Sequence, residues 1–265
     1  RWTAKTRPMA PPMRDQLRAI TREQLAKRII EPSKSPFSSA VVLMPKKGGG
    51  MRFAIDYRSL NAAIQSDAYT LSKVDESLSS LHGAQFFSSL DMKEAFWSVP
   101  LAEHCKQFTA FQTPDGLMQY RRMPMGLKTA SAVFSRYVDH MLGEMKFANV
   151  LAYIDDLLVF AKSADDHIGI LEKLFAQLSR FNMTLGAKKC TLFAPSVGFL
   201  GHVVDRRGVR TDPAKVASIE KLSLDGIKCK KDMESALGLL SYYRKFISRY
   251  SVVEKPLRLK LQHPE

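Results

Sequence analysis

The feature that most constrains this chain is the tetrapeptide Tyr153–Asp156, which reads Tyr-Ile-Asp-Asp and separates two apolar runs, Val150–Ala152 and Leu157–Phe160. Two short apolar runs around a polar pair are typical of a β-hairpin with an exposed tip. Because two adjacent ionised carboxylates repel each other, a divalent cation at the tip would relieve the repulsion. The pattern therefore predicts either a cation site at a strand turn or a solvated acidic turn.

Composition places the chain among globular proteins. Of its 265 residues, 45% are hydrophobic, and a chain of this length favours two or three subdomains over a single core. No stretch approaches the roughly 20 apolar residues of a membrane helix, and the N-terminus lacks the apolar run of a signal peptide. We therefore expect an intracellular protein without a membrane partner. Cys105, Cys190 and Cys229 lack the spacing of zinc sites or disulfides and are expected to be ordinary thiols.

The formal net charge of +14 is unevenly distributed along the chain. Residues 1–52 carry 12 Lys and Arg against 3 Asp and Glu, and residues 206–265 carry 14 against 7. Residues 53–205 carry 14 against 16. Basic ends that flank a slightly acidic middle favour a polyanionic partner at the ends and a cation in the centre, as in proteins that act on nucleic acid. The alternative is a basic surface that serves only solubility.

Apolar periodicity predicts a mixture of helices and strands. We expect helices over 22–30, with Thr21 as N-cap, over 129–142 and 165–182, and in a final region that begins at 211–213. We expect strands over 39–44, 51–56 and 86–90, the first two joined by the cationic loop 46–50. The helix 165–182 is expected to pack through one face, formed by Ile168, Leu171, Leu174, Phe175, Leu178 and Phe181.

Three carboxylates can be considered as one set. Asp91 follows an apolar strand, as Asp155 follows another, so two strands of one sheet could deliver their carboxylates to a shared point, with Asp156 as the third. Carboxylates that hold two Mg²⁺ ions about 3.5–4 Å apart support in-line phosphoryl transfer. Each Asp could equally be an ordinary turn residue.

Several short segments occur along the chain in a characteristic order, and no one of them is specific alone. Together they resemble the reverse transcriptases of long-terminal-repeat retroelements, most closely those of the Ty3/gypsy type. The segments are 30–33, 35–39, 52–61, 67–69, 87–93, 113–116, 122–127, 153–156, 198–202 and 242–247.

The resemblance implies an α+β right-hand polymerase fold of fingers, palm and thumb, with an antiparallel palm sheet backed by helices. The implied boundaries are fingers over 1–66 and 99–122, palm over 67–98 and 123–204, the latter with the primer grip, and thumb over 205–265.

The resemblance also implies the catalytic residues. Asp91, Asp155 and Asp156, with the backbone carbonyl of Met92, match ligands of two Mg²⁺ ions, for which Mn²⁺ could substitute. Either Lys188 or Lys189 matches a general acid that protonates the departing pyrophosphate, and the sequence leaves both open.

Six positions belong to the nucleotide site that the resemblance implies, and Met92 is one of them. Lys47 and Arg52 would hold the triphosphate beside the glycine-rich loop, although a solvated hairpin tip is the alternative. Phe96 would clash with a ribose 2′-hydroxyl, and Gly126 would let the backbone approach the nucleotide. Met125 departs from the pattern, because gypsy-type elements commonly have Phe there and retroviruses Gln.

A further set matches the primer and template contacts. A primer grip would aim the primer 3′-hydroxyl, and basic thumb residues would hold phosphates without reading sequence. The set comprises Tyr153, the primer grip residues Phe199, Leu200 and Gly201, and the basic residues Lys215, Lys221 and Arg244.

The implied function is an RNA-directed DNA polymerase that extends a DNA or RNA primer with deoxynucleoside triphosphates on an RNA template, and also on DNA. The alternative is a catalytically silent, retroelement-derived domain that binds nucleic acid. An RNA-dependent RNA polymerase is a third option, which substitution of Phe96 would distinguish. We expect a pol polyprotein with protease, ribonuclease H and integrase, located in cytoplasmic virus-like particles. This chain itself should not degrade the template, and a homodimer is left open.

Overall fold

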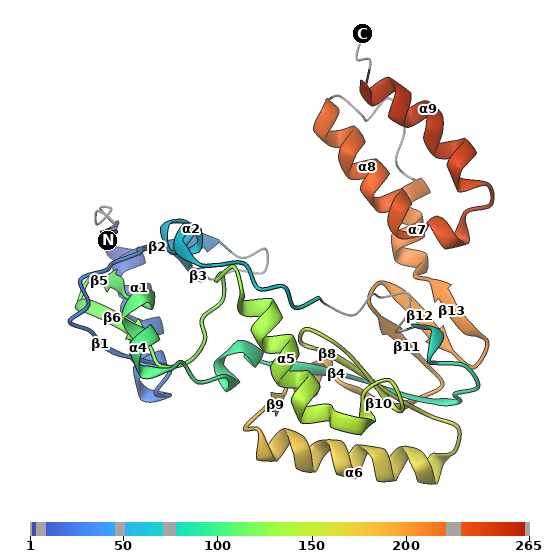
Figure 1. Cartoon of the computed structure of the whole chain (residues 1–265), viewed down its shortest axis with the longest axis horizontal. Helices are drawn as coiled ribbons and strands as arrows, with labels where there is room; N and C mark the ends of the chain where they lie inside the picture. Colours follow the sequence, from blue (N-terminus) through green and yellow to red (C-terminus); the bar gives the residue numbers. More distant parts are fainter. Residues whose placement is uncertain (1, 4–8, 46–50, 71–77, 221–228, 263–265) are drawn as a thin grey trace.

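The computed structural model of the chain describes residues 2–3, 9–45, 51–70, 78–220 and 229–262. Figure 1 shows an N-terminal lobe, a central lobe built on a sheet and a C-terminal helical lobe, arranged around an open space. Among the residues described, no helix has the length and apolar character needed to cross a membrane. The three lobes follow one another in the order expected of fingers, palm and thumb, and the residue boundaries of that division stay a prediction.

The central sheet is antiparallel, with strand order β10-β4-β8-β7, and β9 pairs with the end of β4. Strands β4 and β8 run side by side over six residue pairs, from Phe86 opposite Ala161 to Asp91 opposite Asp156. The strands of this sheet are β4 (Phe86–Lys93), β7 (Val150–Tyr153), β8 (Asp156–Ala161), β9 (Thr184–Leu185) and β10 (Thr191–Ala194).

The two faces of this sheet are covered by different elements. Because side chains alternate along a strand, Leu90 and Leu157 point to helices α5 (Ala130–Leu142) and α6 (Ala164–Arg180). The opposite face packs against a small sheet of β11 (Ser196–Phe199), β12 (His202–Asp205) and β13 (Gly208–Thr211). The residues of this second core include Phe87, Leu151, Leu158, Phe160, Val197, Phe199 and Val204.

The N-terminal lobe has its own core, in which Leu17, Ile30 and Phe111 are almost fully buried. It holds a three-stranded sheet of order β1-β6-β5 and the hairpin of β2 and β3. Its elements are α1 (Pro11–Ala26), β1 (Ile30–Pro32), β2 (Ala40–Pro45), β3 (Met51–Asp56), α2 (Arg58–Ala63), α4 (Glu103–Lys106), β5 (Phe111–Thr113) and β6 (Gly116–Tyr120).

The C-terminal lobe is helical and comprises α7 (Pro213–Glu220), α8 (Lys230–Tyr242) and α9 (Tyr250–Gln262). Figure 1 shows this lobe rising from the end of β13, on the side of the open space opposite the N-terminal lobe. The expected helical region after 211–213 is thereby confirmed.

The hairpins 39–44/51–56 and 150–152/157–160 and the helix over 129–142 are confirmed to within one or two residues. The first helix was predicted wrongly. It starts at Pro11, because the prolines at 11 and 12 suit its first turn, and it ends before Arg28, whose φ is +55°. Thr21 is therefore a buried mid-helix residue that donates to the carbonyls of Leu17 and Arg18, not an N-cap.

Two further expectations need correction. Strand β4 runs three residues beyond Leu90, so Asp91 lies within the strand and not after it. On α6, Leu171, Leu174 and Leu178 are buried, but Ile168 and Phe175 are 45% and 40% exposed, and Phe181 follows the helix. The packed face therefore differs from the apolar pattern, since Ile168 and Phe175 are exposed while Phe181 packs against the core from beyond the helix end.

Candidate active site

Asp91 and Asp156 are placed together by strand register. They are direct partners in the β4–β8 ladder, so both side chains emerge on one face. Their neighbours Leu90 and Leu157 pack against the helices, and the carboxylates therefore point to the opposite face. The expected meeting of carboxylates from two strands is thus borne out for the backbone, but the strand-delivered pair is Asp91 with Asp156.

Asp155 lies in the two-residue turn between the paired residues Tyr153 and Asp156. Its neighbour Ile154 has a φ of +55°, a conformation that β-branched residues rarely adopt, and such strain is concentrated at functional sites. The backbone N–H of Met92 donates to the Asp155 carbonyl at 2.9 Å, which ties the turn to β4. The Met92 side chain is almost fully buried.

The three carboxylates lie close enough for their negative charges to repel one another. Burial raises the pKa of Asp156, and repulsion from Asp155 and Asp91 raises it further. The Lys189 ammonium lies 3.0 Å and 3.2 Å from the two carboxylate oxygens of Asp91, and this bond raises the lysine's own pKa. Lys188 is exposed. Of the two lysines left open by the sequence, Lys189 is the one that contacts a carboxylate.

The donor atoms of the three carboxylates decide whether divalent cations can bind here. In the part of the chain that is described, no three His, Cys, Asp or Glu side chains converge as a ready ion cage, and Asp91 is paired with Lys189. The donor set nevertheless consists of carboxylate oxygens, the ligands that Mg²⁺ prefers. Burial is the main cause of the raised pKa of Asp156, and a cation would relieve the repulsion from Asp155 and Asp91 that adds to it. These residues therefore fit divalent ions that take the place of the Lys189 ammonium beside Asp91.

Gly186 supports Asp91 in a way that sequence reasoning missed. Its N–H donates to the Asp91 carbonyl at 2.8 Å. A Cβ at this position would lie 2.9 Å from Asp91 Oδ1, closer than real Cβ contacts allow. Gly186 follows β9 on the way to β10, and nothing in the local sequence marks it as a neighbour of a carboxylate 95 positions earlier in the chain.

Three of the residues expected at the nucleotide site, Phe96, Met125 and Gly126, are described by the structure. Phe96 is half-buried, with its ring centroid 5.1 Å from that of Phe134. Met125 is 61% exposed, and Gly126 has a φ of +91°, so the left-handed backbone is what requires glycine here. Asn61, another residue that sequence reasoning missed, fixes this loop by donating to the Gly126 carbonyl at 2.9 Å.

Other expected residues are only partly described. Lys47 and Lys221 lie outside the described residues. The backbone of Arg52 pairs with Met44 in the β2–β3 hairpin, and its side chain is outside the described part. Tyr153 is half-buried against the core beneath β11 and β12.

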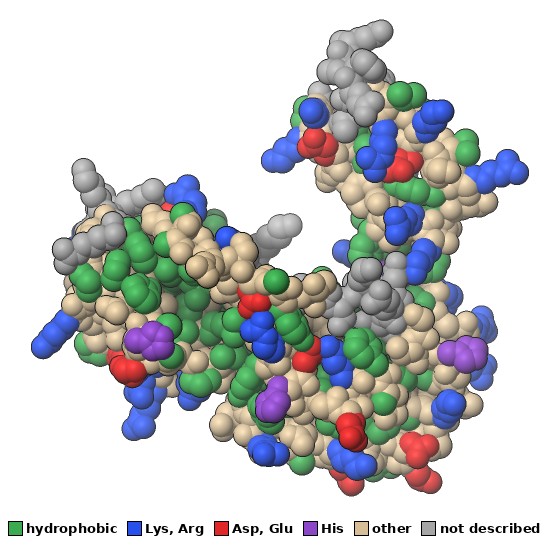
Figure 2. All heavy atoms as spheres, viewed as in Figure 1, with side chains coloured by type: hydrophobic (Ala, Val, Ile, Leu, Met, Phe, Trp, Pro, Cys, Tyr) green, Lys and Arg blue, Asp and Glu red, His purple; other side chains and the backbone are tan. Residues whose placement is uncertain are grey.

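The residues expected to form the primer grip occupy the β11–β12 hairpin. Phe199 is buried in the core on the carboxylate face of the palm sheet, and Leu200 and Gly201 form the turn. Lys215 and Arg244 are exposed on the C-terminal lobe, away from the carboxylates. Figure 2 shows basic side chains on that lobe and a hollow between it and the N-terminal lobe.

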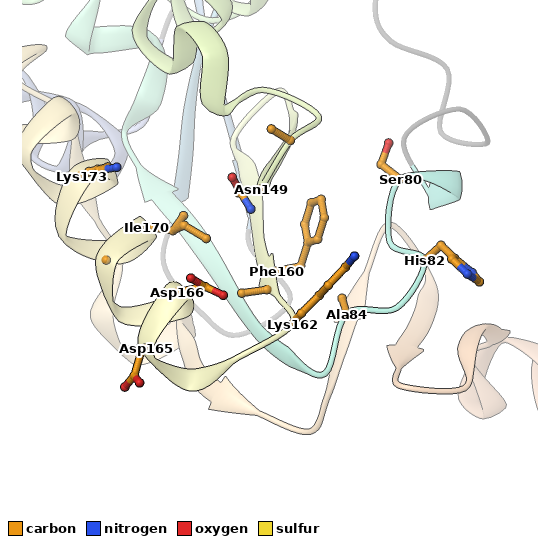
Figure 3. A pocket seen from close by; sticks show the side chains of 13 residues that line it. Ser80, His82, Ala84, Asn149, Phe160, Lys162, Asp165, Asp166, Ile170 and Lys173 are labelled. Carbon is orange, nitrogen blue, oxygen red and sulfur yellow. The ribbon is translucent and has the colours of Figure 1, made fainter.

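A cavity of about 640 Å³ lies elsewhere, at the back of the palm. Figure 3 shows Phe160, Lys162, Asp166 and Ile170 around it, between α6 and the end of β8. None of the three site carboxylates lines it, so it is separate from the candidate active site.

Comparison with known proteins agrees with this geometry. Residues 44–204 match the family described as "Reverse transcriptase (RNA-dependent DNA polymerase)". The chain is 34% identical to the retrovirus-related Pol polyprotein from transposon opus of Drosophila melanogaster, over 96% of this chain and 26% of that protein. It is 32% identical to the enzymatic polyprotein of cauliflower mosaic virus, over 97% of this chain and 39% of that protein. The chain thus spans well under half of these relatives.

Solved structures are also similar. A foamy viral protease-reverse transcriptase in complex with an RNA/DNA hybrid superposes with a TM-score of 0.85 at 22% identity, over 99% of this chain and 35% of that chain. A second structure of that viral protein, in complex with double-stranded DNA, gives a TM-score of 0.86 at 23% identity, over 99% of this chain and 45% of that chain. At this identity the likeness establishes the right-hand polymerase fold.

The fold is that of a right-hand polymerase, and the paired carboxylates lie on its central sheet. The chain belongs to the reverse transcriptase family. The expected resemblance to the pol region of Ty3/gypsy-type retrotransposons is confirmed, since relatives include the Pol polyproteins of transposons opus, 297 and gypsy.

Proposed function

We propose that this chain is an RNA-directed DNA polymerase that extends a primer with deoxynucleoside triphosphates. The observation that carries the proposal is the pairing of Asp91 and Asp156 on adjacent strands, with Asp155 in the turn beside them, in a chain of the reverse transcriptase family. The three carboxylates and the backbone carbonyl of Met92 would hold two Mg²⁺ ions, with Mn²⁺ as a substitute. When bound, such ions activate the primer 3′-hydroxyl and stabilise the leaving pyrophosphate.

The remaining roles follow from position. Lys189, once released from Asp91 by a cation, would protonate the pyrophosphate, and its contact with Asp91 favours it over Lys188. Lys47 and Arg52 border the loop expected to hold the triphosphate. Phe96, held against Phe134, would exclude a ribose 2′-hydroxyl, while Met125 and Gly126 would lie against the base pair being formed.

The primer and template would lie in the hollow between the outer lobes. The support is the basic character of the ends of the chain and the nucleic acid complexes formed by the foamy viral neighbours. We assign 1–66 and 99–122 to fingers, 67–98 and 123–204 to palm and 205–265 to thumb. Phe199, Leu200 and Gly201 would form the primer grip beside Tyr153, while Lys215, Lys221 and Arg244 would contact phosphates.

The natural setting would be a pol polyprotein that acts in virus-like particles, because the transposon relatives are Pol polyproteins much longer than this chain. Use of a DNA template and assembly as a homodimer belong to this proposal as well. The competing function is a silent domain that binds nucleic acid without extending it.

Primer extension tests the proposal. The parent chain and an Asp155→Asn, Asp156→Asn double variant are given an RNA template, a DNA primer, deoxynucleotides and Mg²⁺, and template binding is measured in parallel. Extension by the parent that the double variant loses, with binding retained by both, is the expected result. Binding without extension by the parent would establish the silent domain instead.

The third option is tested separately through the proposed sugar gate. Phe96→Ala is expected to raise ribonucleotide incorporation relative to the parent chain, because the smaller side chain removes the clash with the 2′-hydroxyl. Efficient ribonucleotide use by the parent, with Phe96 intact, would favour an RNA-dependent RNA polymerase.

A further inference from the structure

The turn between β11 and β12 has an unusual backbone. Phe199 pairs with His202, so Leu200 and Gly201 form a two-residue hairpin loop. Both have positive φ angles, +48° and +68°, as in the tight turns that join twisted strands. The carbonyls of such a turn lie outside the strand ladder and need other hydrogen-bond donors.

Those donors come from the thumb. The hydroxyl of Tyr242 donates to the Leu200 carbonyl, and the hydroxyl of Tyr243 donates to the Gly201 carbonyl at 2.7 Å. The two tyrosines stand at the end of α8 and are adjacent in sequence, so one short segment reaches both carbonyls of the turn. We name the pair Tyr242 and Tyr243 the thumb latch.

His202 completes the contact. Its Nδ1 lies 2.9 Å from the Leu200 carbonyl and must donate, because a carbonyl can only accept. Its ring centroid lies 5.3 Å from that of Tyr242 and 5.5 Å from that of Tyr243. His202 and Tyr243 are 4% and 3% exposed. The Tyr243 hydroxyl therefore meets the turn in a largely buried environment, where its loss is costly, whereas Tyr242 is 45% exposed.

The contact between the turn and Tyr243 leaves little space for a side chain at position 201. A Cβ added to Gly201 would lie 3.1 Å from the hydroxyl oxygen of Tyr243, tighter than most real contacts. The bonds use only backbone atoms of the turn, so they fix the path of the chain and do not use the Leu200 side chain.

We propose that Tyr242 and Tyr243 are positioning residues that fasten the primer grip to the thumb, so that the seated thumb holds the turn in place over the palm core on which Leu200 packs. This inference rests on the proposed polymerase function. A primer end held by the grip would then meet Asp91 and Asp156 only when the thumb is seated, which couples thumb position to the alignment of the 3′-hydroxyl.

The test removes the hydroxyls and keeps the rings. Tyr242→Phe, Tyr243→Phe and the double variant are compared in single-turnover primer extension at saturating nucleotide. The double variant is expected to extend about tenfold more slowly. Its dissociation constant for primer–template and its KM for nucleotide are expected to stay within about twofold of the parent values, since phosphate and nucleotide contacts are untouched. Tyr137→Phe is the matched control, because it loses a hydroxyl bond to the Phe181 carbonyl in the palm.

If the double variant extended primer within twofold of the parent rate, the positioning role of the thumb latch would be refuted. The proposed polymerase function would still stand. A parent chain that extends no primer would defeat the proposed function instead. In that case amide hydrogen exchange measures directly whether the two hydroxyls hold the turn in place. Exchange of residues 199–203 at least tenfold faster in the double variant than in Tyr137→Phe supports the attachment, and equal exchange overturns it.

Discussion

The palm carboxylates and the primer grip turn are positioned in different ways. Asp91 and Asp156 are set by strand register, with the β4–β8 ladder continuing through five further residue pairs behind them. The turn at Leu200 and Gly201 ends a hairpin of only four residue pairs, and its carbonyls depend on hydroxyls contributed from 42 positions further along the chain.

The carboxylates would carry out the reaction, whereas the primer grip turn would align the primer with them. A carboxylate on a continuous ladder can lose its charge without moving the backbone, so substitution there should remove the reaction and keep the fold. A turn held by a neighbouring lobe can shift while the carboxylates stay in place. Substitutions at the turn should therefore slow the reaction more mildly, and substitutions in the palm more severely.

The largest effect is expected for Asp156→Asn. Loss of a metal ligand removes several kcal/mol of transition-state stabilisation, so primer extension should fall by about 10³-fold. The metal-free variant should unfold at a higher temperature than the parent chain, because one of three mutually repelling carboxylates is gone. Extension assays and thermal unfolding in EDTA measure the two effects. Asp165→Asn, an exposed residue in the first turn of α6, is the control that should change neither by much.

Gly186→Ala is expected to come next. The added Cβ would lie 2.9 Å from Asp91 Oδ1 and would displace the carboxylate. A displacement approaching 1 Å can cost about 10²-fold in rate, so single-turnover extension should fall by roughly that factor.

Gly169→Ala serves as its control. No atom lies within 4 Å of a Cβ at this position in the middle of α6, and alanine there should raise stability by about 0.5–1 kcal/mol. Equal extension rates for the Gly186 and Gly169 variants would show that the position of Asp91 tolerates the added carbon.

A smaller effect is expected in the turn itself. Gly201→Ala forces alanine into a backbone with φ of +68°, which costs about 1–2 kcal/mol of stability, and crowds the Tyr243 hydroxyl. We expect roughly tenfold slower extension. Gly116→Ala imposes at least as much backbone strain, at φ of +120°, with no atom near the new Cβ. If both variants lost stability and only the Gly116 variant lost activity, the turn at Gly201 would not control the rate of primer extension.

The smallest effect concerns His167, which joins α6 to β4 through a 2.7 Å contact between Nε2 and the Ser88 hydroxyl. Burial lowers the pKa of His167 below its ordinary value near 6.5. The unfolded chain therefore takes up this proton first as the pH falls below about 6.5, and stability is lost down to the depressed pKa. Denaturant unfolding between pH 7.5 and 5 should show a shallower pH dependence for His167→Gln than for the parent. The exposed His82→Gln should follow the parent, and identical slopes for all three would refute this role of burial.

The sequence was most informative where function and local pattern coincide. The apolar runs around Tyr153–Asp156 predicted the hairpin correctly, and the order of motifs predicted the family and the right-hand fold. The pairing of Asp91 with Asp156, and not with Asp155, could not be predicted, because register between strands 65 residues apart is set by packing across the whole sheet.

Contacts between distant segments were also missed. Gly186 and Asn61 act on backbone far from them in sequence, and a glycine or asparagine in a loop gives no local signal of its partner. The tyrosines at 242 and 243 were part of a recognised motif, yet only the three-dimensional structure shows that their hydroxyls reach the turn. The first helix was misplaced because its prolines were not used as a start signal.

The most direct test of the central claim is Mn²⁺ binding followed by electron paramagnetic resonance. The titration is performed on the chain in complex with primer–template and a non-hydrolysable nucleotide, for the parent and for an Asp91→Asn, Asp156→Asn double variant. The parent complex should bind two ions, and the variant should lose that binding while it still binds primer–template. Equal Mn²⁺ binding by both complexes would contradict the assignment of these paired carboxylates as the metal site.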